Sequence, residues 1–564
     1  MTTHPTIGEY LLDQLYERGV RHLFGIPGDY VLGLYDLVEK SRIRHVGTCR
    51  EDSAGFAADA YARVNGIGAV CVTYCVGGFN LTNPIAGAYA EKSPVVVISG
   101  APGLEARARN PLLHHRVRDF STQRDIFGHL TVADTALEDP LTAYHEIDRV
   151  LDAVERYKRP GYIEIPADRV YHAGPHKRVP VDIAELTDIC AMEECIEEAS
   201  AMINAAKQPV ILAGVEIHRF GLQDVLMHFA EKNHLPIAST ILGKSVVSES
   251  HPLHIGIYEG AMGRPEVQRY VETSDCVVIL GAFMTDINLG VYTAGLDPRR
   301  TLYATSELLS IGHHSFHDVP FRSFMAALDR APIERRSPPD LPDPRARTDP
   351  EPDPHAPISV RGLFRVVDRL LTEDTVVVSD VGDCLFGALD LTVHRRTEFL
   401  CPAYYTSMGF AVPGSIGAQL ANPGLRPLVL VGDGAFQMSG LELSTTARLG
   451  LNPVVLVLNN RGYATERQIL DGPFNDIREW AYSRVPDLLG AGRGFVAGTA
   501  AQLEEALHDA FANRDSFSVI DIRLDPHDKS PAMARLAERL SESNVRRSPA
   551  RKPSIRQAKP TSGA

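Results

Sequence analysis

Two polar motifs each follow an apolar run, at a spacing that favours binding of a metal ion. Asp433 stands in a Gly-Asp-Gly motif after the run Leu428–Val431, and Asn460 ends an Asn-Asn pair after the run Val454–Leu458. Because the carboxyl ends of parallel strands meet at one edge of a sheet, these two side chains should lie close together. With the main-chain carbonyl near Gly462, they would offer the hard oxygen ligands that suit Mg²⁺ or Ca²⁺. The alternative is an ordinary strand–turn–helix–strand unit with common turn residues.

The small residues around Asp433 suggest what else binds at this edge. Gly432 and Gly434 carry no side chain, so the main chain there can come close to a bound diphosphate. Ala435, the next residue, is also expected to contact the cofactor, as implied by the family resemblance described below. Phosphate oxygens held at this place would complete the shell of the metal ion.

The elements that must position these residues form three blocks in which short apolar runs alternate with helical patterns. This alternation is typical of parallel sheets covered by helices on both faces, and it predicts an α/β fold with three doubly wound parallel-sheet domains. The expected strands are His22–Gly25, Ala69–Thr73, Val95–Ser99, Tyr162–Ile165, Val210–Ala213, Pro236–Ala238, Cys276–Leu280, Thr301–Ala304, Thr375–Val378, Leu428–Val431, Val454–Leu458 and Ser518–Ile522.

Changes in composition predict the domain boundaries. The first domain is expected at residues 1–180, the second at 190–330 and the third at 358–540. Residues 331–357 are rich in Pro, Asp and Arg and predict an extended linker. Residues 541–564 are polar and basic, which is typical of a disordered tail.

Composition argues against several classes of function. The net charge of −14 disfavours a nucleic-acid surface. No apolar run is long enough to span a bilayer, and the first residues lack the basic start and apolar core of a signal peptide. Eight cysteines in 564 residues do not suggest a disulfide framework. We therefore expect a cytoplasmic protein that binds neither nucleic acid nor membrane.

Further motifs share their residues and their order with a known family. Besides the Gly-Asp-Gly and Asn-Asn motifs, they are Gly25–Asp29, Glu51 before the helical pattern Ala54–Val64, the pair His114-His115, and Gly462–Arg467. Over most of its length the chain therefore resembles the thiamine diphosphate-dependent 2-oxo acid decarboxylases, which include pyruvate, indolepyruvate and phenylpyruvate decarboxylases. The resemblance implies thiamine diphosphate and Mg²⁺ as cofactors, and it makes the three domains pyrimidine-binding, central and diphosphate-binding.

The resemblance implies roles for three residues around the cofactor. Glu51 would bond N1′ of the aminopyrimidine, and it must lie in a dry pocket to do so. Met408 matches the bulky residue under the bend of the cofactor, and the Thr406 carbonyl would bond the 4′-amino group. Without this context, Glu51 would be an ordinary acid at a helix N-terminus and Met408 ordinary core packing.

Four further side chains would handle protons: Asp29, His114, His115 and Glu466. The cofactor is the electron sink of the reaction, so the protein supplies orientation and protons. Glu466 would steer the substrate carboxylate. Asp29 and His115 would serve protonation of the former carbonyl carbon and release of the aldehyde, and His114 would have an orienting role. A His-His pair in isolation is more often a surface or capping feature, and the sequence leaves open which histidine has which role.

Two residues depart from the common pattern of the family. Asp383 lies where many relatives place a hydroxyl residue near the diphosphate, so its charge would repel phosphate unless it points away or meets the metal. Thr465 stands where pyruvate-type relatives often carry a larger aliphatic residue. Ile469, one helical turn after Glu466, would face the same space. The smaller Thr465 would leave more room beside the reacting centre, and this room favours a bulky substrate such as phenylpyruvate or indolepyruvate.

The predicted activity is non-oxidative decarboxylation of a 2-oxo acid to an aldehyde and CO₂. The alternatives are a pyruvate decarboxylase proper, a carboligase similar to acetolactate synthase, and a non-catalytic metabolite-binding protein. By the same resemblance, Glu51 of one subunit and Asp433 of another would hold one cofactor between them. A homodimer is then the minimum active unit, and a homotetramer is expected.

Overall fold

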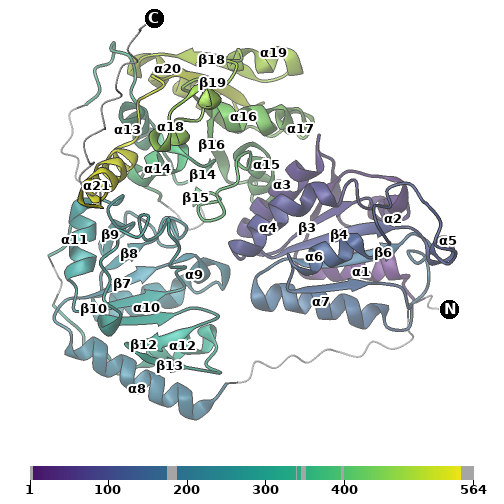
Figure 1. Cartoon of the computed structure of the whole chain (residues 1–564), viewed down its shortest axis with the longest axis horizontal. Helices are drawn as coiled ribbons and strands as arrows, with labels where there is room; N and C mark the ends of the chain where they lie inside the picture. Colours follow the sequence, from purple (N-terminus) through teal and green to yellow (C-terminus); the bar gives the residue numbers. More distant parts are fainter. Residues whose placement is uncertain (1–3, 175–186, 338–339, 344–350, 395–398, 548–564) are drawn as a thin grey trace, which may run out of the picture.

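The first of three sheets lies in the N-terminal part of the chain (Figure 1). The computed structural model describes residues 4–174, 187–337, 340–343, 351–394 and 399–547. This first sheet is parallel throughout. In spatial order its strands are β2 (Arg44–Val46), β1 (His22–Gly25), β3 (Gly68–Val72), β4 (Val95–Ala101), β6 (Gly161–Pro166) and β5 (Ala133–Ala136).

Helices cover both faces of the first sheet because its central strands are apolar on both sides. One core cluster joins the sheet to α1 (Ile7–Glu17), α2 (Leu32–Lys40) and α7 (Ala143–Tyr157). A second cluster joins the other face to α3 (Glu51–Asn65), α4 (Thr82–Ala90) and α6 (Thr122–Gly128). The short helix α5 (Leu104–Arg107) follows β4 and buries none of its residues.

The second sheet is parallel except at one edge, where β12 and β13 form an antiparallel hairpin. Its strands in order are β13 (His314–Phe316), β12 (Leu309–Ile311), β11 (Thr301–Ala304), β10 (Cys276–Leu280), β7 (Pro209–Ala213), β8 (Ile237–Ser239) and β9 (His254–Ile257). One face packs on α8 (Ile189–Ala205), α9 (Val215–Arg219), α10 (Gln223–Asn233) and α12 (Phe321–Arg330), and the other on α11 (Pro265–Thr273).

The third sheet is parallel and again covered on both faces. Its strands in order are β15 (Phe399–Leu400), β14 (Thr375–Ser379), β16 (Arg426–Gly432), β17 (Val454–Asn459), β19 (Ser518–Arg523) and β18 (Arg493–Ala497). One face packs on α13 (Val360–Leu370), α14 (Asp383–Gly387), α20 (Ala500–Ala512) and α21 (Pro531–Arg547), and the other on α15 (Ala411–Ala421), α16 (Asp433–Ser439), α17 (Leu443–Arg448) and α19 (Val485–Leu489).

Three sheets of this kind confirm the predicted α/β fold. Each expected strand overlaps an observed strand, but seven strands were not predicted, and six of these lie at the edges of the sheets. They are β2, β5, β9, β12, β13, β15 and β18. Helix α21 (Pro531–Arg547) continues past residue 541, where the tail was expected to begin. Residues 548–564, and residues 338–339 and 344–350 of the expected linker, lie outside the described residues.

Helices α3 and α15 pack together where the first sheet meets the third (Figure 1). A Cβ on Gly417 of α15 would stand 2.0 Å from the carbonyl oxygen of Ala57 in α3, so only glycine permits this approach. Near it, the buried Arg63 of α3 forms ion pairs with Asp59 at 2.8 Å and with Glu91 at 2.9 Å. Arg63 also donates to the Cys401 carbonyl at 3.0 Å, which links α3 to the third sheet.

Among the helices in the described part of the chain, none combines the length and the apolar character that a membrane span requires.

Substitution of His254 is expected to change how stability depends on pH. Burial, with Lys244 and His251 nearby, lowers the pKa of His254 to about 3. Below pH 6.5 this histidine takes up a proton in the unfolded chain but not in the folded one, so the free energy of unfolding falls by about 1.4 kcal/mol per pH unit as the pH drops from 6.5 towards 3. In His254→Gln this contribution should disappear, and urea unfolding at pH 6.0, 5.5 and 5.0 measures the change in slope.

The exposed His508 provides the control for this prediction. His508→Gln should keep the wild-type slope of stability against pH. An unchanged slope in His254→Gln would show that His254 is protonated in the folded protein.

Candidate active site

Glu51 is the first residue of α3, at the carboxyl edge of the first sheet, so the helix begins before the predicted Ala54. Asn80 lies in the short 3₁₀ turn η2 (Phe79–Leu81) and donates through Nδ2 to Glu51 Oε2 at 2.9 Å. This bond holds one carboxylate oxygen, and the N-terminal end of the helix dipole favours its negative charge.

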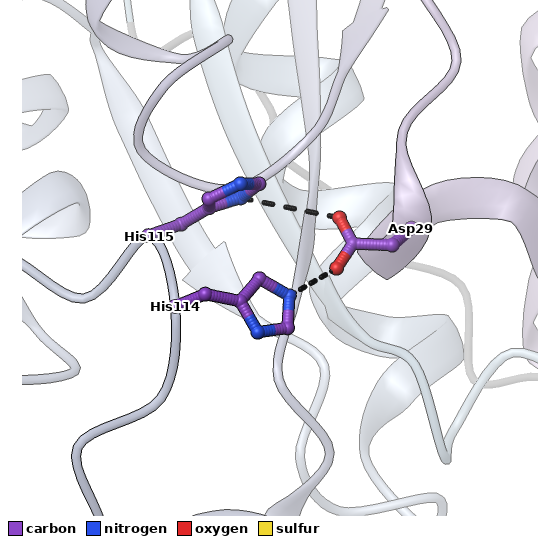
Figure 2. Close-up of side chains that lie close together, drawn as sticks. All are labelled: Asp29, His114 and His115. Atoms are coloured by element: carbon purple, nitrogen blue, oxygen red, sulfur yellow. Dashed lines mark hydrogen bonds and ion pairs between the residues drawn. The ribbon is translucent and has the colours of Figure 1, made fainter.

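Asp29, His114 and His115 form a second cluster near the same edge. Asp29 begins the 3₁₀ turn η1 (Asp29–Val31) soon after β1, and the histidines lie in the loop between α5 and α6. Figure 2 shows both imidazole rings turned towards the Asp29 carboxylate. His114 Nε2 is hydrogen-bonded to Asp29 Oδ2, and His115 Nδ1 lies 3.9 Å from Oδ1. The structure thus brings together the three residues that the motifs predicted.

The surroundings of this cluster favour a charged aspartate. Although partial burial alone would raise the pKa of Asp29, the hydrogen bond from His114, a backbone bond and the charges of both histidines hold it below its ordinary value. The Tyr30 ring stacks on His114 with a centroid separation of 4.9 Å, which restricts the imidazole. The hydrogen bond and the ring stacking therefore hold His114 beside a charged Asp29.

A cavity of about 390 Å³ lies at the carboxyl edge of the third sheet. Its wall contains every predicted residue of the C-terminal half: Asp383, Thr406, Met408, Gly432, Asp433, Gly434, Ala435, Asn460, Gly462, Thr465, Glu466 and Ile469. Glu51, Asp29, His114 and His115 do not line it. The predicted residues of one chain therefore form two separate groups.

Asp433 and Asn460 both line this wall, and each offers an oxygen suited to a cation. Asp433 is fully buried at the start of α16, and its Oδ1 and Oδ2 accept bonds from the Gly434 and Gly462 amides at 2.8 and 3.1 Å. Burial raises the pKa of Asp433 to about 6 against the opposing effect of these bonds. Asn460 Oδ1 is buried and has no hydrogen-bond partner among the described residues. A divalent cation would satisfy this oxygen and stabilise the buried carboxylate, so the residues fit Mg²⁺.

Glycine is required at two positions beside these ligands. A Cβ on Gly434 would come within 2.5 Å of the Tyr463 ring, and Gly462 has a φ of +155° with the Asn475 carbonyl 2.1 Å from the Cβ position. In contrast, a Cβ on Gly432 would meet no atom within 4 Å. The main chain at Gly432 therefore borders open space, as the prediction of a diphosphate contact requires.

Thr406 and Met408 reach the cavity from the segment that precedes α15. Thr406 has a φ of +56° and Gly409 a φ of +89°, so the main chain is left-handed on both sides of Met408. Met408 packs against the apolar cluster beneath the sheet. Its position in the wall is thus set by the main chain and by core packing together.

The charge of Asp383 has a partner inside the protein. Its Oδ1 accepts a bond from the Ser530 amide at 3.2 Å, just before α21. Burial raises the pKa of Asp383, and the residue still lines the cavity wall. The bond from the start of α21 holds one of its carboxylate oxygens inside the protein.

The structure adds residues that the motifs did not indicate. Ile287, from the second sheet's part of the chain, lines the cavity, as does Phe386 of α14. Asn80 binds the Glu51 carboxylate. No local pattern marked them, because an apolar residue after a strand and an asparagine in a turn are common. A spacing search cannot detect a wall to which two different sheets' parts of the chain contribute.

Comparison with known proteins supports the same assignment. Family models described as the N-terminal TPP binding, central and C-terminal TPP binding domains of thiamine pyrophosphate enzymes match residues 5–121, 196–324 and 380–522. An indole-3-pyruvate decarboxylase of Azospirillum brasilense is 37% identical over 548 residues, which cover 94% of this chain and 98% of the relative.

More distant relatives have related activities in their names. An alpha-keto-acid decarboxylase of Mycobacterium tuberculosis (strain ATCC 25618 / H37Rv) is 36% identical over 533 residues, covering 92% of this chain and 94% of the relative. A probable pyruvate decarboxylase of Schizosaccharomyces pombe is 30% identical over 552 residues, or 96% of each chain. These findings confirm the predicted family and the enzyme class. The chain belongs to the thiamine diphosphate-dependent 2-oxo acid decarboxylases.

Proposed function

We propose that this enzyme converts a bulky aromatic 2-oxo acid, such as phenylpyruvate or indolepyruvate, into an aldehyde and CO₂ with thiamine diphosphate and Mg²⁺. The observation that carries this proposal is the cavity of about 390 Å³, in which Thr465 and Ile469 lie beside the predicted cofactor contacts. The small side chain of Thr465 leaves room next to Glu466. The similarity to an indole-3-pyruvate decarboxylase supports the same substrate class.

The chain's own residues would divide the work. Asp433, Asn460 and Gly462 would hold Mg²⁺, and Gly432, Gly434 and Ala435 would contact the diphosphate. Thr406, Met408 and Glu51 would position the rings of the cofactor, which acts as the electron sink for the departing carboxylate. Glu466 would orient the substrate carboxylate. Asp29, His114 and His115 would deliver the proton that the former carbonyl carbon needs.

Two copies of the chain would complete one site, with Glu51 of one and Asp433 of the other. Asp29, His114 and Glu466 are exposed to solvent in the single chain, although decarboxylation is favoured where water is excluded. Exposed apolar side chains adjoin these residues: Leu112 is 95% and Ile469 75% exposed. A second copy would cover them. The proposed assembly is a homodimer at minimum, with a homotetramer expected.

The proposed location is the cytoplasm. All eight cysteines are free, which a reducing cytoplasm would allow.

Product analysis tests the reaction. Purified protein is supplied with thiamine diphosphate, Mg²⁺ and, in separate assays, pyruvate, a branched-chain 2-oxo acid, phenylpyruvate or indolepyruvate. We expect CO₂ and the matching aldehyde, with the highest kcat/KM for an aromatic acid. An acyloin as the main product would instead support a carboligase. A marked preference for pyruvate would overturn the substrate class.

Substitution of Thr465 tests the size argument. Thr465→Trp should fill the cavity beside Glu466 and lower kcat/KM for phenylpyruvate about tenfold more than for pyruvate. Pyruvate is the internal control, and Thr465→Ser, which keeps the space, should retain the wild-type order of substrates. Equal losses on both acids would remove Thr465 from the determinants of specificity. Steady-state kinetics on the two substrates provide the measurement.

A further inference from the structure

Asp380 is a fully buried carboxylate directly after β14, and neither the motifs nor the cavity wall includes it. Its own amide donates to the Leu430 carbonyl of β16 at 2.8 Å, so its main chain is fixed to the middle of the third sheet. Burial raises its pKa to about 6, although the main-chain amides around it oppose the shift. Keeping a charge at this place costs free energy, which calls for an explanation.

Within the described part of the chain, the hydrogen-bond donors to this carboxylate are main-chain amides. Oδ2 accepts from the Gly409 amide at 3.0 Å and from the Ala411 amide at 3.1 Å. Oδ1 accepts from the amides of Val381 at 3.1 Å and of Gly409 at 3.2 Å. Bonds to a charged acceptor are about twice as strong as neutral ones.

Two of the amides that Asp380 binds, those of Gly409 and Ala411, belong to the segment that carries Thr406 and Met408. Ala411 is the first residue of α15, and the preceding residue, Phe410, has no side chain able to cap the helix. Asp380 therefore supplies the cap from a different strand, where the helix dipole also favours an anion. Gly409, with its left-handed backbone, has no side chain of its own that could fix it. The turn between Met408 and α15 thus depends on a carboxylate distant in sequence.

We propose that Asp380 is a positioning residue for this segment: by binding the Gly409 and Ala411 amides, it sets the place of the Thr406 carbonyl and the Met408 side chain in the cavity. The inference rests on the proposed roles of Thr406 and Met408 towards the cofactor. Asp380 contacts neither cofactor nor substrate in this scheme and acts only through the main chain. A displacement of about 1 Å in such a site costs roughly a hundredfold in rate.

The test compares Asp380→Asn with the matched variant Asp148→Asn. Both remove a buried carboxylate charge, since Asp148 is 1% exposed, but Asp148 lies in α7 and binds the Tyr10 hydroxyl. The first readout is amide hydrogen–deuterium exchange of the cofactor-free protein. In Asp380→Asn, peptides that contain residues 406–411 should exchange at least about tenfold faster, because one N–H loses its charged acceptor. In Asp148→Asn the same peptides should exchange as in the wild type.

The second readout is the dependence of activity on the concentration of thiamine diphosphate. Asp380→Asn should raise the thiamine diphosphate concentration for half-saturation about tenfold and lower kcat by a further tenfold to hundredfold. Asp148→Asn should leave both values near the wild type, whatever it does to thermal stability. If Asp380→Asn does not fold, Asp380→Glu, which keeps the charge but moves the carboxylate by one methylene, should change each readout in the same direction.

The outcomes separate this inference from the proposed function. Wild-type exchange of residues 406–411 in the Asp380 variant, or equal changes in both variants, would overturn the role of Asp380. Faster exchange with unchanged cofactor affinity and kcat would also overturn it, because the segment would then be irrelevant to the site. A wild-type enzyme that neither binds thiamine diphosphate nor releases CO₂ would contradict the proposed function instead.

Discussion

Replacement of Glu51 by glutamine is expected to reduce kcat for decarboxylation by about three orders of magnitude, because a well-placed acid or base contributes roughly 10²–10⁴-fold. Glutamine has nearly the same shape and can still accept the bond from Asn80 Nδ2, which measures 2.9 Å. The loss should therefore appear in kcat, with the fold and the affinity for Mg²⁺ intact. Steady-state kinetics measure kcat, and calorimetric titration of Mg²⁺ in the presence of thiamine diphosphate measures the affinity for the ion.

The neighbouring carboxylate serves as the control. Asp52 also lies in the first turn of α3, where it pairs with Arg50 at 3.1 Å. Asp52→Asn removes a similar charge from the same helix end, yet it should reduce kcat less than about threefold, as an exposed ion pair contributes little. Comparable losses in both variants would mean that Glu51 acts through helix stability and not through the cofactor.

Replacement of Asp433 by asparagine is expected to weaken Mg²⁺-dependent binding of thiamine diphosphate at least about a hundredfold. Loss of a group that merely supports a metal ligand costs roughly 10–100-fold in affinity, and loss of the ligand itself should cost more. Asparagine keeps the volume and one acceptor for the amides of Gly434 and Gly462, so the loop should persist. Titration of the cofactor at several Mg²⁺ concentrations checks the effect.

Asp148→Asn is again the control, since it removes a buried carboxylate far from the cavity. Its affinity for the cofactor should equal that of the wild type. If Asp433→Asn bound thiamine diphosphate and Mg²⁺ normally, the assignment of the metal site would be wrong. In that case the unpartnered Asn460 Oδ1 would need a different explanation.

Co-expression of the two inactive variants distinguishes one-chain from two-chain sites. If each site takes Glu51 from one copy and Asp433 from the other, random pairing of Glu51→Gln with Asp433→Asn restores about a quarter of the wild-type sites. If both residues act within one chain, no site is restored. Activity per purified assembly, measured against each variant alone, decides between these two arrangements.

The sequence predicted all inner strands of the three sheets except β12, and it missed the edge strands. Interior strands such as β10 and β17 are buried on both faces and read as continuous apolar runs. The edge strand β18, in contrast, exposes Arg493 and Val496, and β2 has only three residues. Such strands form because a neighbour offers unpaired main-chain groups, so a local pattern does not reveal them. The two strands of the β12–β13 hairpin were missed for the same reason.

Site residues could be predicted from the sequence where they stand in short continuous motifs. Gly-Asp-Gly and Asn-Asn end neighbouring strands, so the rule on parallel strand ends was enough to bring Asp433 and Asn460 together. The bond of Asp383 to Ser530 could not be foreseen, because it joins residues far apart in sequence. The same holds for Asp380 and Gly409, and for Ile287 in the cavity wall.

The close contact between Gly417 and Ala57 has a consequence for an assembled enzyme. Helix α3 starts with Glu51, and α15 starts just after Met408, so the contact that Gly417 permits connects the two helices that carry these residues. In the proposed dimer, Glu51 would act in the partner's site, while Met408 would line the site of its own chain. Two chambers in such a pair would share two rigid connections of this kind. A shift of one helix on filling the first chamber would then be felt in the second, which gives the pair a mechanical route for communication.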